Sequence, residues 1–200
     1  MLSSQKRAVA VLRQHAGFAQ TRDFEQAGVG RWVLPDLVRA GVIERVRHGF
    51  YRLPDVPALD HRDMVEACAM VPHGVVFLLS ALSYYDLTTY NPWRVSLAVG
   101  SKAKVVLPQS PPIELHYLKS QYHELGAVVL ELPAGRIRIY DREKTVCDCL
   151  RYRNRIGLDI TLEGLKNYLK SPYRNIDKLL RYAGQCRIEH ILLRYLEAML

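Results

Sequence analysis

The feature that most constrains the fold is the segment VIERVRHGFYRLP, residues 42–54, in which apolar and basic residues alternate around His48-Gly49. Alternation with a period of two is typical of a strand that buries one face, and a glycine permits the tight turn of a hairpin. We therefore expect two short antiparallel strands that are joined at His48-Gly49 and carry their basic side chains outward.

Three short helices are predicted before this hairpin. The first ends before Gly17, the second has Thr21 as its N-cap, and the third begins at Trp32 or Val33. Pro35 is compatible with the third helix because a proline is tolerated in the first turn, where its missing N–H is not needed. Three helices and a basic hairpin in one short segment indicate a winged helix-turn-helix.

A linker is predicted directly after the hairpin. The stretch LPDVPALD, residues 53–60, contains two prolines and two acids, a composition typical of a connection between domains. We therefore predict a winged helix-turn-helix DNA-binding domain over residues 1–54 and an α/β effector domain over residues 55–200. A chain of 200 residues is long enough to form both cores.

The second predicted domain mixes helices and strands. A helix is expected over residues 61–71, and a buried helix in the apolar stretch VVFLLSALSYYDL, residues 75–87. Five strand-like runs follow, namely RVSLAVG, KVVL, IELHYL, AVVLEL and RIRIY. In the last run, Ile137 and Ile139 would face the core, while Arg136, Arg138 and Tyr140 would face outward.

After residue 141 the apolar period returns to that of a helix. We predict four helices, over residues 142–155, 162–170, 174–183 and 187–199, with Asp141 and Thr161 as N-caps. The predicted fold class is therefore α+β: an N-terminal winged helix-turn-helix, then a larger mixed α/β domain that ends in a helical segment.

The chain is basic, and its charge is unevenly distributed. Lys and Arg number 28 against 20 Asp and Glu, which leaves a formal net charge of +8. Residues 1–53 carry +5, residues 54–135 carry −3, and residues 136–200 carry +6. Such a balance favours a polyanionic partner, and nucleic acid is the commonest one.

The first basic region coincides with elements that can contact double-stranded DNA. A helix can enter the major groove and place arginines on base edges, whereas hairpin cations and helix N-termini reach phosphates. The alternative for any single arginine is a solvated surface, with Trp32 partly in the core. The predicted DNA-binding residues are Thr21, Arg22, Arg31, Trp32, Asp36, Arg39, Arg45, Arg47, His48 and Arg52.

A second basic set follows Asp141. On a single helix, Arg151 and Arg155 would share a face because they are four residues apart. A solvated helix surface is the default interpretation of this set, and a second contact with DNA or with an RNA-bearing partner is the alternative. The candidate second basic surface consists of Arg142, Lys144, Arg151, Arg153 and Arg155.

Signals for catalysis, metal binding and membrane insertion are weak. The four cysteines lack the paired spacing of a zinc or disulfide module, which favours reduced core thiols. The seven histidines show no metal-ligand spacing, and the chain has no nucleophile-elbow or phosphate-loop motif. No apolar run reaches the length of a membrane-spanning helix. We expect a cytoplasmic protein that is not an enzyme and has no cofactor, metal or catalytic residue.

Three short motifs occur in a characteristic order along the chain. They are the basic wing Arg47-His48-Gly49-Phe50-Tyr51, the helix with Ser80-Ala81-Leu82 running into Asp86-Leu87-Thr88, and the segment Arg142-Glu143-Lys144-Thr145-Val146-Cys147-Asp148. In order and spacing they resemble the AbiEi-type antitoxins of type IV toxin–antitoxin systems, also described as transcriptional regulators of viral defence, and the resemblance covers nearly the whole chain.

This resemblance implies two roles. The N-terminal domain would bind repeats in the promoter of its own operon and repress transcription. The C-terminal domain would neutralise a cognate nucleotidyltransferase-like toxin, directly or functionally.

Two other functions stay open from the residues alone. One is a protein-interaction module whose winged helix does not bind DNA. The other is a nucleic-acid-modifying enzyme built on the middle strands, with Glu114 or Asp141 in its site. Against the enzyme, Gly100-Ser101 is not followed by the paired aspartates that would hold two metal ions.

Overall fold

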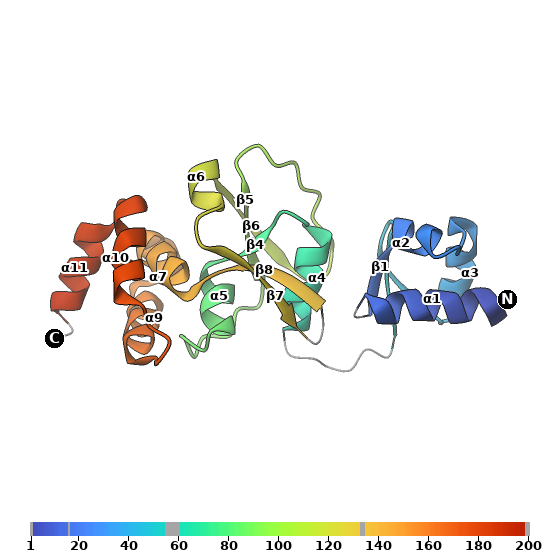
Figure 1. Cartoon of the computed structure of the whole chain (residues 1–200), viewed down its shortest axis with the longest axis horizontal. Helices are drawn as coiled ribbons and strands as arrows, with labels where there is room; N and C mark the ends of the chain where they lie inside the picture. Colours follow the sequence, from blue (N-terminus) through green and yellow to red (C-terminus); the bar gives the residue numbers. More distant parts are fainter. Residues whose placement is uncertain (1, 16, 55–60, 133–134, 199–200) are drawn as a thin grey trace.

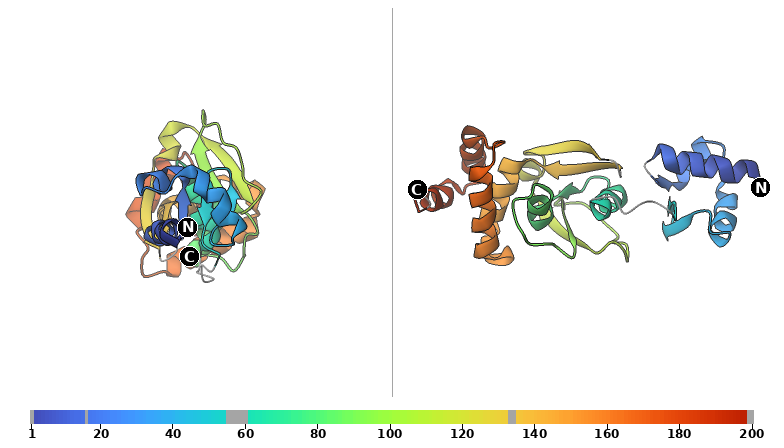
Figure 2. Two further views of the ribbon diagram at one scale, coloured as in Figure 1. Left: turned by 90° about the vertical axis from the view of Figure 1, so that its right-hand side faces the viewer. Right: turned by 90° about the horizontal axis from the view of Figure 1, so that it is seen from below.

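The computed structural model describes residues 2–15, 17–54, 61–132 and 135–198. The molecule is elongated, and its termini lie at opposite ends (Figure 1). A small helical region with its own sheet, a larger sheet and a group of helices follow one another along the long axis, as a second view also shows (Figure 2). The expected α+β class is thus confirmed. Most of the predicted linker, residues 55–60, lies outside the described residues.

The N-terminal region, residues 2–54, has the element order of a winged helix. Its elements are α1 (Leu2–Gln14), β1 (Phe18–Gln20), α2 (Thr21–Gln26), the 3-10 turn η1 (Arg31–Val33), α3 (Leu34–Arg39), β2 (Glu44–Arg47) and β3 (Phe50–Arg52). The predicted hairpin is confirmed, and β1 adds a third strand, in the antiparallel order β1-β3-β2. The sequence analysis missed β1 because three residues are too few to show a period.

Of two local predictions for this region, one is confirmed and one is wrong. Pro35 does lie in the first turn of α3, as expected. Thr21 is not an N-cap: it is the first residue of α2, and Gln20 is the cap. The cap shifts because strand β1 continues through Gln20, whose backbone N–H donates to a carboxylate oxygen of Asp23 at 2.7 Å.

The small sheet is covered on both faces. Ala19 and Tyr51 belong to the buried cluster formed with α1, α2 and α3, where the ring of Phe24 meets that of Tyr51 edge to face at 5.6 Å. Phe18 and Phe50 point the other way and join the core of the central region. Alternate side chains of β1 and β3 therefore pack into two different cores.

The central region contains one mixed sheet. Its elements are α4 (Arg62–Met70), β4 (Val75–Val76), α5 (Leu78–Tyr84), β5 (Val95–Gly100), β6 (Ile113–Leu118), α6 (Ser120–His123), β7 (Ala127–Leu132) and β8 (Gly135–Tyr140). The strand order is β6-β5-β4-β8-β7, with β4 parallel to β8 and antiparallel to β5. The short β4 thus lies in the middle of the sheet.

Three predictions for the central region were wrong. The apolar stretch 75–87 is not one helix, because its first two residues form β4 and α5 begins only at Leu78. The run KVVL forms no strand, and Val106 within it is 85% exposed. Ile137 and Ile139 face the core as expected, but Tyr140 is also buried, because the packing of α7 covers the other face of the sheet at this point.

In the described part of the chain, five helices follow the sheet. They are α7 (Arg142–Arg151), α8 (Arg153–Ile156), α9 (Leu158–Lys170), α10 (Ile176–Gln185) and α11 (Glu189–Glu197). Asp141 is the N-cap of α7 as predicted, since its side chain accepts from the backbone N–H of Lys144 at 2.9 Å. Thr161 is not a cap: α9 starts at Leu158, and the Thr161 hydroxyl donates back to the Gly157 carbonyl.

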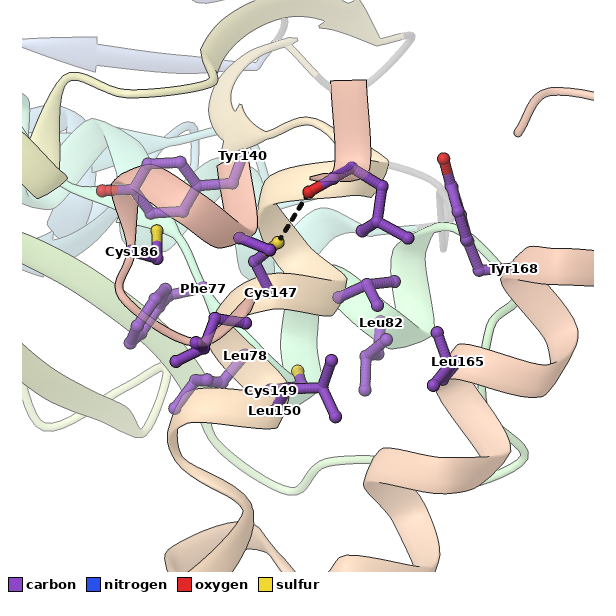
Figure 3. Close-up of a cluster of buried hydrophobic side chains, with 14 of the residues drawn as sticks. Phe77, Leu78, Leu82, Tyr140, Cys147, Cys149, Leu150, Leu165, Tyr168 and Cys186 are labelled. Atoms are coloured by element: carbon purple, nitrogen blue, oxygen red, sulfur yellow. Dashed lines mark hydrogen bonds between the residues drawn. The ribbon is translucent and has the colours of Figure 1, made fainter. Parts of the chain in front are cut away.

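The C-terminal helices pack with α5 and the sheet around one apolar core (Figure 3). Cys147 belongs to it and donates its thiol hydrogen bond to the carbonyl of Leu179 at 3.7 Å. All four cysteines are free and buried, as predicted. Within the described residues, no helix is long and apolar enough to cross a membrane.

Candidate DNA interface

The helix α3 and its preceding turn present a polar face to solvent. Leu34 and Leu37 are buried in the N-terminal core, as the helical projection predicted, whereas Trp32 is 78% exposed. The Trp32 ring folds back over Gly30, where an added Cβ would lie 2.4 Å from the ring. The turn therefore holds an indole on the outside of the protein. Arg31 is exposed beside it.

Asp36 and Arg39 form an ion pair on the same exposed face of α3. The Arg39 side chain is 78% exposed. An ion pair in water contributes little to stability, because solvent screens it. Arg39 can therefore exchange its carboxylate partner for a phosphate or a base edge at little cost. Together with Arg31 and Trp32, these two residues lie on the exposed side of α3 and its preceding turn, and their contact with a DNA groove stays a prediction.

The tip of the wing is a tight turn with a defined hydrogen bond. Gly49 adopts a φ of 72°, a left-handed conformation that favours glycine. The guanidinium of Arg45 donates to Nδ1 of His48 at 2.7 Å. Arg47 is the last residue of β2, and its backbone pairs with Phe50. Arg45 and His48 are both exposed.

The start of α2 lies against the wing. The backbone N–H of Thr21 donates to the carbonyl of Gly49 at 2.9 Å. A Cβ on Gly49 would lie 3.3 Å from the Thr21 hydroxyl. Arg22 follows, with a side chain that is largely exposed and 3.6 Å from Asp23. The structure thus brings Thr21 and Arg22 next to the wing turn, although about thirty residues of chain separate them.

Arg22 also borders a cavity of about 690 Å³ between the N-terminal and central regions. Arg136 and Arg138 of β8 line the opposite side. Both are paired within their own region, Arg136 with Glu131 at 2.6 Å and Arg138 with Glu124. Arg22 therefore lies at the border between the wing and the central region.

Arg52 makes contacts that the sequence analysis did not predict. Its guanidinium lies 2.5 Å from the Glu44 carboxylate and 3.4 Å from that of Glu66, a buried residue of α4. Burial opposes the charged form, but the hydrogen bonds and charges of both carboxylates outweigh it and raise the pKa of Arg52. Arg62 also binds Glu66, at 3.0 Å. Arg52 therefore joins the wing to α4.

The second basic set is not one surface. Lys144 is completely buried, with its ammonium 2.5 Å from Asp148 and 4.4 Å from the centroid of the Tyr140 ring. Its placement on a surface was wrong, because a periodicity shows which residues share a helix face but not whether another element covers that face. Arg142 is half-buried and lies over two tyrosine rings.

The other three arginines of this set lie around a break in the predicted helix. The helix over 142–155 is interrupted at Tyr152, so Arg151 and Arg155 are not on one continuous helix. Arg151 donates to the carbonyl of Cys186 at 3.0 Å, and Arg153 donates to that of Leu150 at 3.0 Å. Arg151 and Arg155 are the two exposed members of the set.

The histidines of the central region have separate surroundings. Within the described ranges, no group of three or more His, Cys, Asp or Glu side chains could hold a metal ion. His116 is buried against the rings of Phe77 and Tyr152, and burial lowers its pKa. Its Nε2 lies 3.6 Å from Glu114. His123 instead binds Glu124 and the carbonyl of His73.

Comparison with known proteins finds a family model that matches the N-terminal region. Residues 6–54 match a family model described as "Transcriptional regulator, AbiEi antitoxin". The expected resemblance to AbiEi antitoxins is therefore confirmed over these residues, which include α2, α3 and the wing. The family implies a role in transcriptional regulation or as an antitoxin.

A solved structure resembles nearly the whole chain. The crystal structure of the RV2827C protein from Mycobacterium tuberculosis aligns with a TM-score of 0.62 and 14% sequence identity, over 96% of this chain and 77% of that one. At this identity the likeness concerns the fold alone. A search of curated protein sequences found no match to the chain.

Proposed function

We propose that the chain is a DNA-binding autorepressor and antitoxin, in which residues 1–54 bind double-stranded repeats in its own promoter. One observation carries the DNA-binding part. The exposed face of α3, the wing turn and the start of α2 present their cations on one small scaffold of groove-reading topology. The repressor would act in the cytoplasm, where its operator is accessible, and it would need no cofactor.

Each residue has a proposed task. Arg31, Trp32, Asp36 and Arg39 would face the major groove, where arginine can pair with guanine through two hydrogen bonds. The phosphate contacts would come from the start of α2 and the wing, namely Thr21, Arg22, Arg45, Arg47 and His48. We leave Arg52 out because two carboxylates hold it.

The antitoxin part rests on the family match and on the division of the chain. Residues 55–200 would neutralise a cognate nucleotidyltransferase-like toxin. Among the second basic set, the exposed Arg151 and Arg155 could extend the contact with DNA, whereas Lys144 cannot because it is buried.

The test is binding of labelled promoter DNA to the full chain, measured by fluorescence anisotropy at several salt concentrations. The three arginines proposed to contact phosphates, Arg22, Arg45 and Arg47, predict a slope of log K against log salt of about −3 for each bound chain. Arg47→Ala should reduce the slope by about one and leave sequence preference unchanged. Arg39→Ala should weaken binding and relax the preference at one base pair.

Arg181→Gln is the matched control. Arg181 is exposed on α10, at the other end of the molecule, so its loss should change neither the affinity nor the preference. Promoter DNA that stays unbound at low salt and micromolar protein would refute the DNA-binding role. For the antitoxin role, the chain should restore growth of cells that express the neighbouring toxin gene, and Arg39→Ala should retain that rescue.

A further inference from the structure

A second concave surface lies far from the wing, between α5, β7 and the C-terminal helices. It encloses about 590 Å³, a volume within the range of ligand sites. Tyrosines, aliphatic side chains and charged groups share its lining. They are Tyr84, Tyr85, Val128, Leu130, Asp141, Arg142, Glu143, Tyr173, Asn175 and Lys178.

Arg142 is the distinctive residue of this cavity. Its guanidinium carbon lies over the ring of Tyr85 at 4.6 Å and over that of Tyr173 at 4.9 Å. Stacking on aromatic rings uses the faces of a guanidinium and leaves the in-plane N–H donors available. Across the described residues, no carboxylate or carbonyl accepts a hydrogen bond from Arg142. The two rings therefore hold a donor fork in a fixed orientation with its hydrogen-bonding edge unused.

The neighbouring charges are already paired. The ammonium of Lys178 lies 3.0 Å from the Asp141 carboxylate and 3.2 Å from that of Glu143. The hydroxyl of Tyr168 donates to Glu143 at 3.0 Å. The two acids and two cations of the lining cancel. A polyanion such as nucleic acid gains little from a neutral site that contains two carboxylates, whereas a single carboxylate can still pair with the fork of Arg142.

The rest of the lining is suited to a peptide. Val128 and Leu130 come from β7, the outermost strand of the sheet, so one backbone edge of this strand faces away from the sheet. Extended peptides can add to such an edge, with alternate side chains in adjacent pockets. Tyr173 is 69% exposed, and tyrosine and arginine are enriched among the residues that dominate protein interfaces.

We propose that this cavity binds an extended segment of a protein partner that presents an aspartate or glutamate to Arg142 and an adjacent apolar side chain to Val128 and Leu130. The proposal rests on the proposed function in taking that partner to be the toxin. Neutralisation would then involve direct contact with the toxin at this cavity.

The test starts from a probe that needs no knowledge of the toxin. A library of random twelve-residue peptides displayed on phage is selected on the full chain and counter-selected on Arg142→Gln. The expected peptides share one acidic residue next to an aliphatic or aromatic one. A synthetic peptide of this kind should bind the unmodified chain and lose about tenfold or more in affinity with Arg142→Gln, because a desolvated charge pair loses one partner.

Further variants separate recognition from folding. Arg142→Lys keeps the charge but removes the planar fork, so it should lower the affinity for the peptide about as much as Arg142→Gln does. Tyr173→Ala, at an exposed loop position, should also lower the affinity for the peptide. Circular dichroism should show that this variant keeps its helix content. Arg181→Gln should have no effect. Replacing the acid of the peptide by its amide should weaken binding to the unmodified chain and make no further difference with Arg142→Gln.

Three results would overturn the proposal. They are selected peptides without an acidic residue, equal affinity for the unmodified chain and Arg142→Gln, and binding of a single-stranded oligonucleotide that depends on Arg142. Promoter binding by the unmodified chain is measured in parallel. If it fails while the peptide result holds, then the repressor role is wrong and the cavity remains a protein-binding site.

Discussion

The buried pair of Lys144 and Asp148 gives the sharpest test of how the C-terminal core is held together. The Lys144 side chain is fully buried and that of Asp148 is 4% exposed, with 2.5 Å between the ammonium and the carboxylate. Lys144→Met fills a similar volume but leaves the carboxylate buried without its cation. Breaking a buried pair in this way costs about 3–5 kcal/mol. We expect that loss in the free energy of unfolding at pH 8.

The loss should depend on pH. Burial raises the pKa of Asp148 to about 6, although Lys144 opposes the shift. A raised pKa means that the folded protein binds the proton of Asp148 more tightly than the unfolded chain does. Protonation of Asp148 therefore stabilises the folded protein fully below the ordinary pKa of 3.8, and this stabilisation disappears as the pH rises through about 6. Without Lys144 the pKa rises further. The deficit of Lys144→Met should therefore be smaller at pH 5.5 than at pH 8.

The assay is urea unfolding followed by far-ultraviolet circular dichroism at pH 8 and pH 5.5. Lys166→Met, at an exposed position on α9, should change stability by less than about 0.5 kcal/mol. Lys144→Met combined with Asp148→Leu should regain most of the loss, because neither charge then remains buried. A deficit below about 1 kcal/mol for Lys144→Met, or one that grows as the pH falls, would refute this account of the pair.

Three further predictions concern the wing, its contact with α4 and the thiols. Gly49→Ala should cost about 1–2 kcal/mol in thermal unfolding, because its φ is 72° and the new Cβ meets Thr21; an unchanged midpoint would contradict this. Glu66→Ala should cost about 1–3 kcal/mol in urea unfolding, since Arg52 and Arg62 lose their shared acceptor, whereas Glu197→Ala at an exposed position should be neutral. Ellman's reagent should react with no thiol of the folded protein and with four thiols in urea. All four cysteines are buried, and burial raises the pKa of Cys68 to about 11. Rapid reaction of the folded protein would contradict the burial of the thiols.

Much of the fold followed from local patterns. The alternation around His48-Gly49 predicted the hairpin, and the helical spacing of Leu34 and Leu37 predicted the buried side of α3. The spacing also left Trp32 and Arg39 on the exposed side. These predictions hold because each element buries one face against a core only a few residues away in sequence.

The composition of the proposed DNA interface was less accessible. Nothing in the sequence indicated that Arg52 would bind Glu66, because the two come together only when the small sheet packs on α4. The sequence also gave no signal for the cavity around Arg142. The two tyrosines that stack on Arg142 come from the C-cap of α5 and from the loop before α10, far apart along the chain.

The sequence by itself determined the α+β class, the order of the main elements, the basic ends of the chain and the third helix with its following hairpin. Tertiary structure alone decided which cations remain available to a partner. Periodicity defines the faces of a helix or strand, whereas coverage of a face depends on segments distant in sequence. For that reason Lys144 and Tyr140, which look like surface residues in their local pattern, are completely buried.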